Sequence, residues 1–150
     1  MMNHSPAELL RASLVGARIG VFPSKTSKKP WPVFVGHMPD DPDDVICVYD
    51  TAPVMDGRLQ ETGETVKHLG FQVRVRSFSY RAAYAKITTI DARLDDIRRE
   101  GIVINGESYI IAAVTKTSGP LAMGQEPDGK RRENFTLNGT MTVRNARERS

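Results

Sequence analysis

Cysteine is almost absent from this sequence. Cys47 is the single one, so no disulfide can form within the chain. It lies in the apolar run 45–48 with no basic neighbour to lower its pKa, so we expect a small buried hydrophobic residue and not a reactive thiol. No apolar run approaches the roughly 20 residues of a membrane span, and residues 1–6 lack the pattern of a secretory signal. We therefore expect a protein that stays in a cytosol-like compartment.

Motifs for catalysis or metal binding are also missing. His4, His37 and His68 lie in unrelated segments, without cysteine or carboxylate at ligand spacing. No nucleotide-binding, zinc-protease or nucleophile-elbow motif occurs. The acidic run 40–44 lacks the spaced ligands of a calcium loop, so we interpret it as a solvated loop in preference to a calcium or magnesium site. We predict no catalytic residue, no metal and no cofactor.

Charge of a single sign is lacking as well, because the net charge is only +3. Basic residues gather at 25–29, 130–132 and 144–149, and acidic residues at 40–44. Separated patches of opposite sign are typical of proteins that dock on copies of themselves or on charged partners. Solvated loops explain them equally well, and the composition does not choose between the two.

A short helix is predicted near the start of the chain. Ser5 is a typical N-cap, Pro6 suits the first helical position and Glu8 completes a capping box. Gly16 or Gly20 is expected to end this helix.

A longer helix is predicted by apolar residues that recur at spacings of four and three. They are Ala83, Ile87, Ile90, Leu94 and Ile97. We expect Ser79 to cap the helix, Gly101 to end it, and Asp95 to pair with Arg99 on its exposed side.

Strands are predicted where apolar residues alternate with polar ones or form short buried runs. These segments are 33–35, 45–49, 71–76, a hairpin over 102–111 with an Asn-Gly turn, and 135–143. The order of elements indicates one α+β domain over residues 1–150, with a mostly antiparallel β-sheet packed against one long and one short helix.

Three segments are predicted to be irregular. Residues 51–69 and 116–132 are rich in glycine, proline and polar residues, so we expect two long flexible loops that act as docking surfaces. Residues 145–150 form a charged tail. Trp31 stands between two prolines, either as a hydrophobic plug, which we favour, or as an interface anchor.

Strict alternation in 71–76 places Phe71, Val73 and Val75 on the buried face of a strand, and Arg74 and Arg76 on its outer face. An RNA-binding sheet needs aromatic residues on its outer face for base stacking. Arginines and threonines occupy it here, so stacking is disfavoured, although weak contact with phosphates stays open.

Three local patterns occur in a recognisable order: an acidic turn leading to a strand that ends in Tyr-Asp-Thr, an alternating strand running into a long helix, and a hairpin followed by a glycine-rich stretch and a last strand. They span 42–51, 71–80 and 102–138. In this order they resemble the tail terminator, or tail-completion, proteins of long-tailed bacteriophages, over about residues 40–144. Ala52-Pro53 departs from the glycine of the family pattern, and 25–31 has no counterpart.

The resemblance implies a non-enzymatic protein of the phage neck. It implies a ring, usually a homohexamer, that caps the tail tube, ends its polymerisation and provides the head-tail joining surface. The partners would be further copies of the chain, the tail tube protein, a head-side neck or stopper protein and also the tape measure protein. DNA would pass through without sequence-specific binding, and no membrane would be involved. The location would be the virion, after assembly in the host cytoplasm.

Two alternatives remain beside the terminator. One is a head-completion or stopper protein of the neck, and the other is a small nucleic-acid-binding module that uses the basic C-terminal tail. An enzyme is the most distant possibility.

Six residues are candidates for the interface: Trp31, Arg74, Arg76, Tyr80, Arg131 and Arg132. We expect Arg74 and Arg76 to pair with carboxylates of the next copy, in preference to lining a DNA channel. The acidic run 40–44 is expected to lie away from any such channel, because packed DNA repels negative charge.

Overall fold

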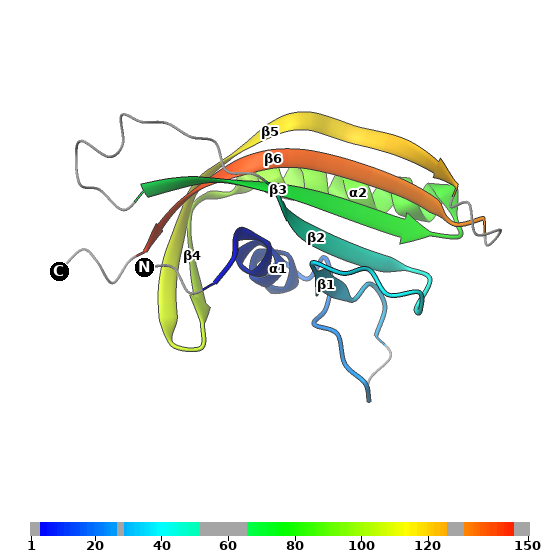
Figure 1. The fold of residues 1–150 in the computed structure, drawn as a ribbon, viewed down its shortest axis with the longest axis horizontal. Coiled ribbons are helices and arrows are strands. Elements are labelled where there is room, and N and C mark those ends of the chain that lie inside the picture. The colour runs from blue at the N-terminus through cyan, green and yellow to red at the C-terminus, as the bar shows by residue number, and fades with distance from the viewer. Residues whose placement is uncertain (1–3, 27–28, 52–65, 126–130, 146–150) are drawn as a thin grey trace.

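The computed structural model describes residues 4–26, 29–51, 66–125 and 131–145. Within them, two helices and a six-stranded sheet form the fold (Figure 1). The elements are α1 (Pro6–Gly16), β1 (Val33–Val35), β2 (Val45–Thr51), β3 (Val66–Ser77), α2 (Tyr80–Asp96), β4 (Arg98–Ile104), β5 (Glu107–Gln125) and β6 (Glu133–Asn145). The strand order is β1-β2-β3-β6-β5-β4, and only the β1–β2 pair is parallel. The predicted α+β class is confirmed.

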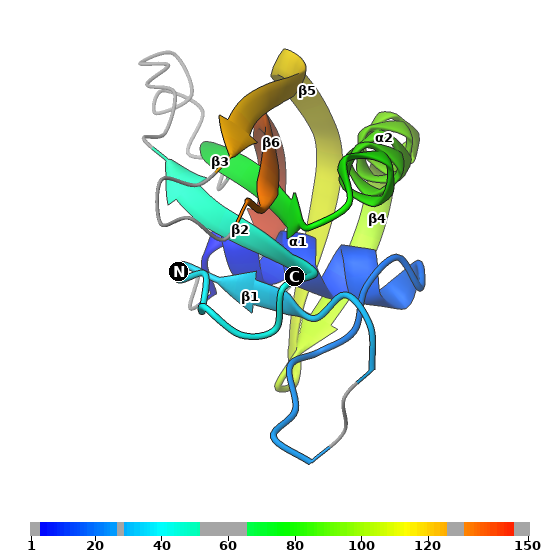
Figure 2. The ribbon, with the colours of Figure 1, turned by 90° about the vertical axis from the view of Figure 1, so that its right-hand side faces the viewer.

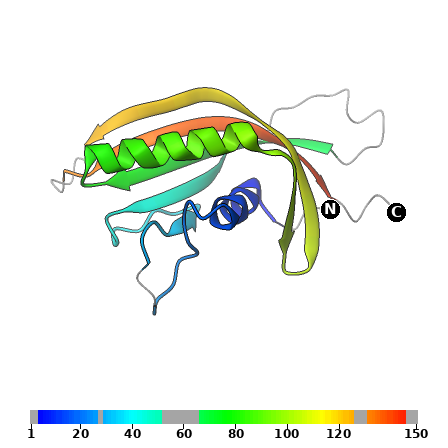
Figure 3. The same cartoon turned by 180° about the vertical axis from the view of Figure 1, so that it is seen from behind.

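Both helices cover the same face of the sheet. The register aligns Val48 of β2 with Val73 of β3 and Leu137 of β6, so these buried side chains share one face. α2 contacts β3, β5 and β6 along this face, as Figure 3 shows from behind. The sheet curls, and α1 lies between β1–β2 and β4 (Figure 2). One core therefore joins every element, and among the described residues no helix covers the opposite face of the sheet.

α1 begins as predicted. The Ser5 side chain accepts a hydrogen bond from the Glu8 amide at 3.2 Å, and the Glu8 carboxylate accepts one from the Ser5 amide at 3.0 Å. The helix ends at Gly16, and the chain then turns at Arg18, which has a positive φ of 62°. The Ile19 amide closes this turn by donating to the Leu14 carbonyl at 3.0 Å.

α2 buries the predicted face, with Leu94 only 1% exposed, and Ser79 caps it as expected. The predicted end at Gly101 is wrong. α2 ends at Asp96 because Ile97 turns extended and leads into β4, where Gly101 lies. The predicted Asp95–Arg99 pair is also wrong, because Asp95 binds Lys116 of β5 at 2.9 Å. No helix among the described residues has both the length and the apolar character that crossing a membrane demands.

The predicted loop over 116–132 is wrong for most of its length. β5 continues to Gln125 and pairs with β6, with register shifts near Ser118 and Ala122. Beyond Ala113, β5 is no longer paired with β4, so this part is an edge strand. Pro120 fits there because an edge strand needs backbone donors on one side only. Residues 126–130 lie outside the described part of the chain.

The predicted loop over 51–69 is wrong at its end, because β3 already begins at Val66. Its middle, 52–65, lies outside the described residues, as does 146–150 of the predicted tail. The hairpin between β4 and β5 is confirmed. Asn105 and Gly106 take positive φ values of 49° and 81° at its turn.

Candidate assembly interface

The segment 39–44 folds over the outer face of the sheet and is held by Arg76. This guanidinium is 3% exposed. Its Nη2 donates to the carbonyl oxygens of Pro39 and Pro42, both at 2.7 Å, and its Nε donates to the carbonyl of Asp43 at 3.2 Å. A single buried cation thus satisfies several backbone acceptors of the acidic turn.

A second buried arginine, Arg132, holds the same segment from the start of β6. Its Nη2 donates to the Asp40 carboxylate at 2.8 Å and its Nη1 to the Asp40 carbonyl at 2.6 Å. The Asp43 carboxylate lies 3.3 Å from Nη1, and Ser77 donates to the Asp44 carboxylate at 2.6 Å. The acidic segment 40–44 is therefore fixed on the sheet, with its carboxylates at the rim.

Arg76 and Arg132, two of the six candidate interface residues, are both buried and bonded within the chain. Alternation places Arg76 on the outer face, but a segment about 35 residues earlier in the chain covers it. Arg74 is half-buried, with its guanidinium carbon 5.7 Å from the centre of the Tyr49 ring. Arg131 is exposed and has a positive φ of 57°.

Trp31 is partly buried against the core, as the plug interpretation expects. The Lys86 ammonium lies 5.1 Å from the centre of the Trp31 ring and donates to the Ile19 carbonyl at 2.8 Å. Burial lowers the pKa of Lys86. Lys86 thereby connects α2 to Ile19 and to the Trp31 ring.

The remaining surface of Trp31 lines a groove of about 1000 Å³. We call it the aromatic groove. It lies between residues 21–25, residues 29–34, the acidic segment and the start of α2. Residues that characterise it are Phe22, Lys25, Trp31, Phe34, Asp41 and Phe78. Aromatic walls with charges of both signs at the rim suit an extended or helical segment of another protein.

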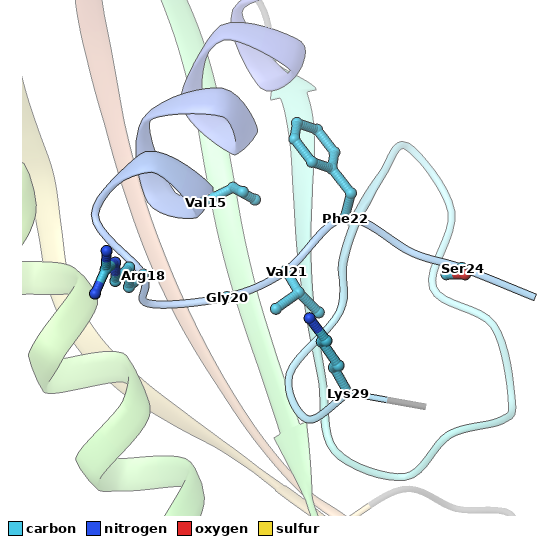
Figure 4. A pocket seen from close by; sticks show the side chains of 7 residues that line it. All are labelled: Val15, Arg18, Gly20, Val21, Phe22, Ser24 and Lys29. Atoms are coloured by element: carbon cyan, nitrogen blue, oxygen red, sulfur yellow. The ribbon is translucent and has the colours of Figure 1, made fainter. Parts of the chain in front are cut away.

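A smaller hollow of about 370 Å³ adjoins the aromatic groove (Figure 4). Val15 and Phe22 form its apolar wall, while Arg18 and Lys29 bring positive charge. Phe22 is 53% exposed, and Arg11 lies over its ring at 5.3 Å. The hollow and the aromatic groove share Phe22, so the segment 20–24 offers apolar surface to both.

A second apolar surface lies on the other flank of α2, and we call it the tyrosine patch: Tyr80 and Tyr84. The two tyrosine rings stack in parallel at 6.5 Å, and both contact the buried Phe135 edge-on. Both tyrosines are at least half exposed. Leu121 and Met123 of β5 are also over half exposed, but Leu121 pairs with Thr136 and therefore lies on the outer face of the sheet, away from the tyrosine rings.

The sequence analysis selected Tyr80 alone from this patch. The four-residue spacing of Tyr80 and Tyr84 on a predicted helix was the signal for the second tyrosine.

The outer face of the central strands is polar. Gln72 donates to Asn138 at 3.0 Å, and Asn138 donates to Ser118 at 3.2 Å, which links β3, β6 and β5. Thr142 and His68 hydrogen bond at 3.1 Å further along this face. Cys47 is buried beside it, and burial raises the pKa of its thiol. The prediction that Cys47 is buried is confirmed.

In the described part of the chain, no three histidine, cysteine, aspartate or glutamate side chains lie together so that they could hold a metal ion. The carboxylates with defined partners serve structural pairs, such as Asp91 with Lys116 at 2.6 Å. Hydrogen bonds to Asp91 and Asp95 raise the pKa of Lys116. The surfaces that stand out among the described residues are the aromatic groove and the tyrosine patch.

Comparison with known families bears on what these surfaces bind. The model of the family described as bacteriophage tail terminator protein matches residues 13–143, from within α1 to near the end of β6. A search of curated proteins finds no match.

Proposed function

Because the chain belongs to the family of bacteriophage tail terminator proteins, a structural component of the phage tail, we propose that it acts by shape and not by catalysis. Several copies form a ring, a hexamer in our proposal, at the end of the growing tail tube. The ring stops the addition of tube subunits and offers the head-side neck protein a new surface. Assembly takes place in the host cytoplasm, and the ring stays in the virion.

The match to the family over residues 13–143 carries this proposal. The surface supports it, because a subunit between two neighbours needs two different docking surfaces. The aromatic groove and the tyrosine patch lie on opposite flanks of α2 and differ in shape and composition. The polar outer face of β3, β6 and β5 remains for the tail tube, the tape measure protein or the head-side neck protein.

DNA passes the ring without sequence-specific binding in this proposal. Packed DNA repels carboxylates, so we place the acidic segment 40–44 away from the channel. Arg76 can no longer serve as a lining residue, because it is buried and bonded within the chain. Arg74, the other arginine of β3, is half-buried over Tyr49 and is the one that remains as a candidate to line the channel.

The test is the native mass of the purified chain, alone and mixed with tail tube protein. We expect a ring of defined size that binds tube ends, together with tubes of limited length in electron micrographs. Tubes that grow at the same rate and to the same length with and without the chain contradict the proposal. Binding to the head-side neck ring without binding to tubes identifies a stopper protein instead. Steeply salt-dependent DNA binding identifies a nucleic-acid-binding module.

A further inference from the structure

The exposed apolar side chains of this protein are concentrated at one end. Seven large hydrophobic residues in the described part of the chain are at least half exposed, and four of them, Phe22, Phe78, Tyr80 and Tyr84, belong to the aromatic groove or the tyrosine patch. The others are Leu121 and Met123 of β5 and Val103 near the β4–β5 turn. Large clustered apolar surface on a soluble protein marks a place where another protein binds.

The two surfaces face away from each other across the start of α2. Ala82 lines the aromatic groove, while Tyr80 and Tyr84 form the tyrosine patch. Residues two positions apart on an α-helix are separated by about 200°, so Ala82 and the tyrosines project on nearly opposite flanks. A surface and its complement on opposite flanks of one subunit produce head-to-tail contacts, which close into rings.

The two surfaces offer one pair of opposite charges, although Lys25 and Lys29 also line the aromatic groove. Arg81 is exposed next to Tyr80 of the tyrosine patch. Asp41 and Asp44 are exposed at the rim of the aromatic groove. Among the described residues, neither Arg81 nor Asp41 has an ion-pair partner within the chain. A neighbouring copy brings opposite charges to both surfaces.

We infer that the tyrosine patch of one copy docks in the aromatic groove of the next copy, and that this contact builds the ring. The inference rests on the ring of the proposed function and names the surfaces that form it. The stacked tyrosines supply rigid apolar area with polar hydroxyl ends, which is the composition of interface centres. Phe22 and Phe78 receive them, and Arg81 meets Asp41 at the rim.

Single charged substitutions test each surface. Tyr84→Lys damages the tyrosine patch, and Phe78→Lys damages the aromatic groove. Val103→Lys is the matched control, because Val103 is equally apolar and 68% exposed but lies outside both surfaces. With tail tube protein present, we expect rings from the wild type and from Val103→Lys, and monomers from the other two variants.

Tyr84 also contacts the buried Phe135, so its replacement can disturb folding. Tyr80→Lys and Phe22→Lys repeat the test at positions that lie over half in solvent. Thermal unfolding midpoints near that of the wild type verify that each variant is folded.

A mixing experiment separates a head-to-tail contact from a symmetric one. The patch variant keeps an intact groove, and the groove variant keeps an intact patch. When the two are mixed in equal amounts, one contact can form, between the patch of the groove variant and the groove of the patch variant. We expect a heterodimer with twice the monomer mass and no ring. A mixture that stays monomeric overturns the head-to-tail pairing.

The rim charges are tested by exchange. Arg81→Asp and Asp41→Arg alone should each weaken ring formation by a few-fold, and the double variant should recover it. Folded patch and groove variants that form rings at the wild-type yield overturn this interface and leave the proposed ring intact. A wild-type chain that is monomeric both alone and with tube protein overturns the ring and the interface together.

Discussion

The two buried arginines show how single residues fix the outer face of this protein. Arg76 and Arg132 are 3% and 1% exposed, and a buried cation is costly unless its donors are paired. Here the donors meet carbonyl and carboxylate oxygens of residues 39–43. The acidic segment is therefore part of the rigid fold and forms one wall of the aromatic groove.

Replacement of Arg76 by methionine tests this role. We expect Arg76→Met to lower the free energy of unfolding by roughly 2–4 kcal/mol, because several backbone carbonyls lose their donor. Arg74→Met is the matched control two residues away, with an expected loss below about 1 kcal/mol. Urea unfolding followed by circular dichroism measures both. Equal small losses would show that the Arg76 contacts do not stabilise the acidic segment.

Tyr49 provides a test that depends on pH. Burial, and next its hydrogen bond with Cys47, raise the pKa of Tyr49 to about 12. The unfolded chain loses this proton at about pH 10. The folded state thus binds more protons between these values, and stability should fall as pH rises from about 10 to about 12. Tyrosinate absorbance against pH measures the pKa, and Tyr49→Phe should show a smaller loss of stability over this interval.

At the scale of elements, β5 and β6 decide the shape of the sheet. β6 pairs along its whole length with β3 and β5, and Gly139 lies at its centre. A Cβ atom at Gly139 would lie 2.8 Å from the Phe71 ring and 2.8 Å from the Thr115 carbonyl oxygen. The strands are therefore packed so closely against Phe71 that only glycine fits at this position.

Gly139→Ala should lower the free energy of unfolding by roughly 1–3 kcal/mol, because the strand must shift to admit the methyl group. Gly119→Ala in β5 is the control, since its Cβ would meet no atom within 4 Å. We expect it to change stability by less than about 0.5 kcal/mol. Thermal or urea unfolding of both variants gives the comparison, and a neutral Gly139→Ala would mean that Phe71 can move aside.

At the scale of the molecule, α1 and α2 bury their apolar faces in one core on one side of the sheet. Leu10 of α1, Phe71 of β3 and Leu94 of α2 all belong to this core. Neither helix has a core of its own, so neither should unfold separately.

We therefore predict a single cooperative unfolding transition. Trp31 is the only tryptophan and lies in the N-terminal part of the chain, so its fluorescence reports on that part. Far-UV circular dichroism reports on the whole sheet and both helices. In the wild type, the fluorescence midpoint and the circular dichroism midpoint should coincide. In Leu94→Ala the two midpoints should again coincide with each other. A Trp31 signal that changes at lower urea would show that 19–34 detaches before the core unfolds.

The sequence by itself determined the elements whose signals are local. Four of these signals depend only on backbone geometry within a few residues. They are the capping box at Ser5, the apolar face from Ala83 to Leu94, the alternation in 71–76 and the Asn-Gly turn. The three-part resemblance also pointed to the family that the match over 13–143 supports. These local predictions were correct because the interactions that stabilise each element lie within the same few residues that form the pattern.

The tertiary structure alone decided which surfaces are open. Alternation places Arg76 on the outer face, but only folding brings residues 39–43 over it. Pro120 indicated a loop, yet it fits in β5 because that part of the strand is an edge. Phe22 and Phe78 are far apart in sequence, and only folding brings them to one groove. Contacts between distant segments set burial and edge position, and local periodicity carries no information about them.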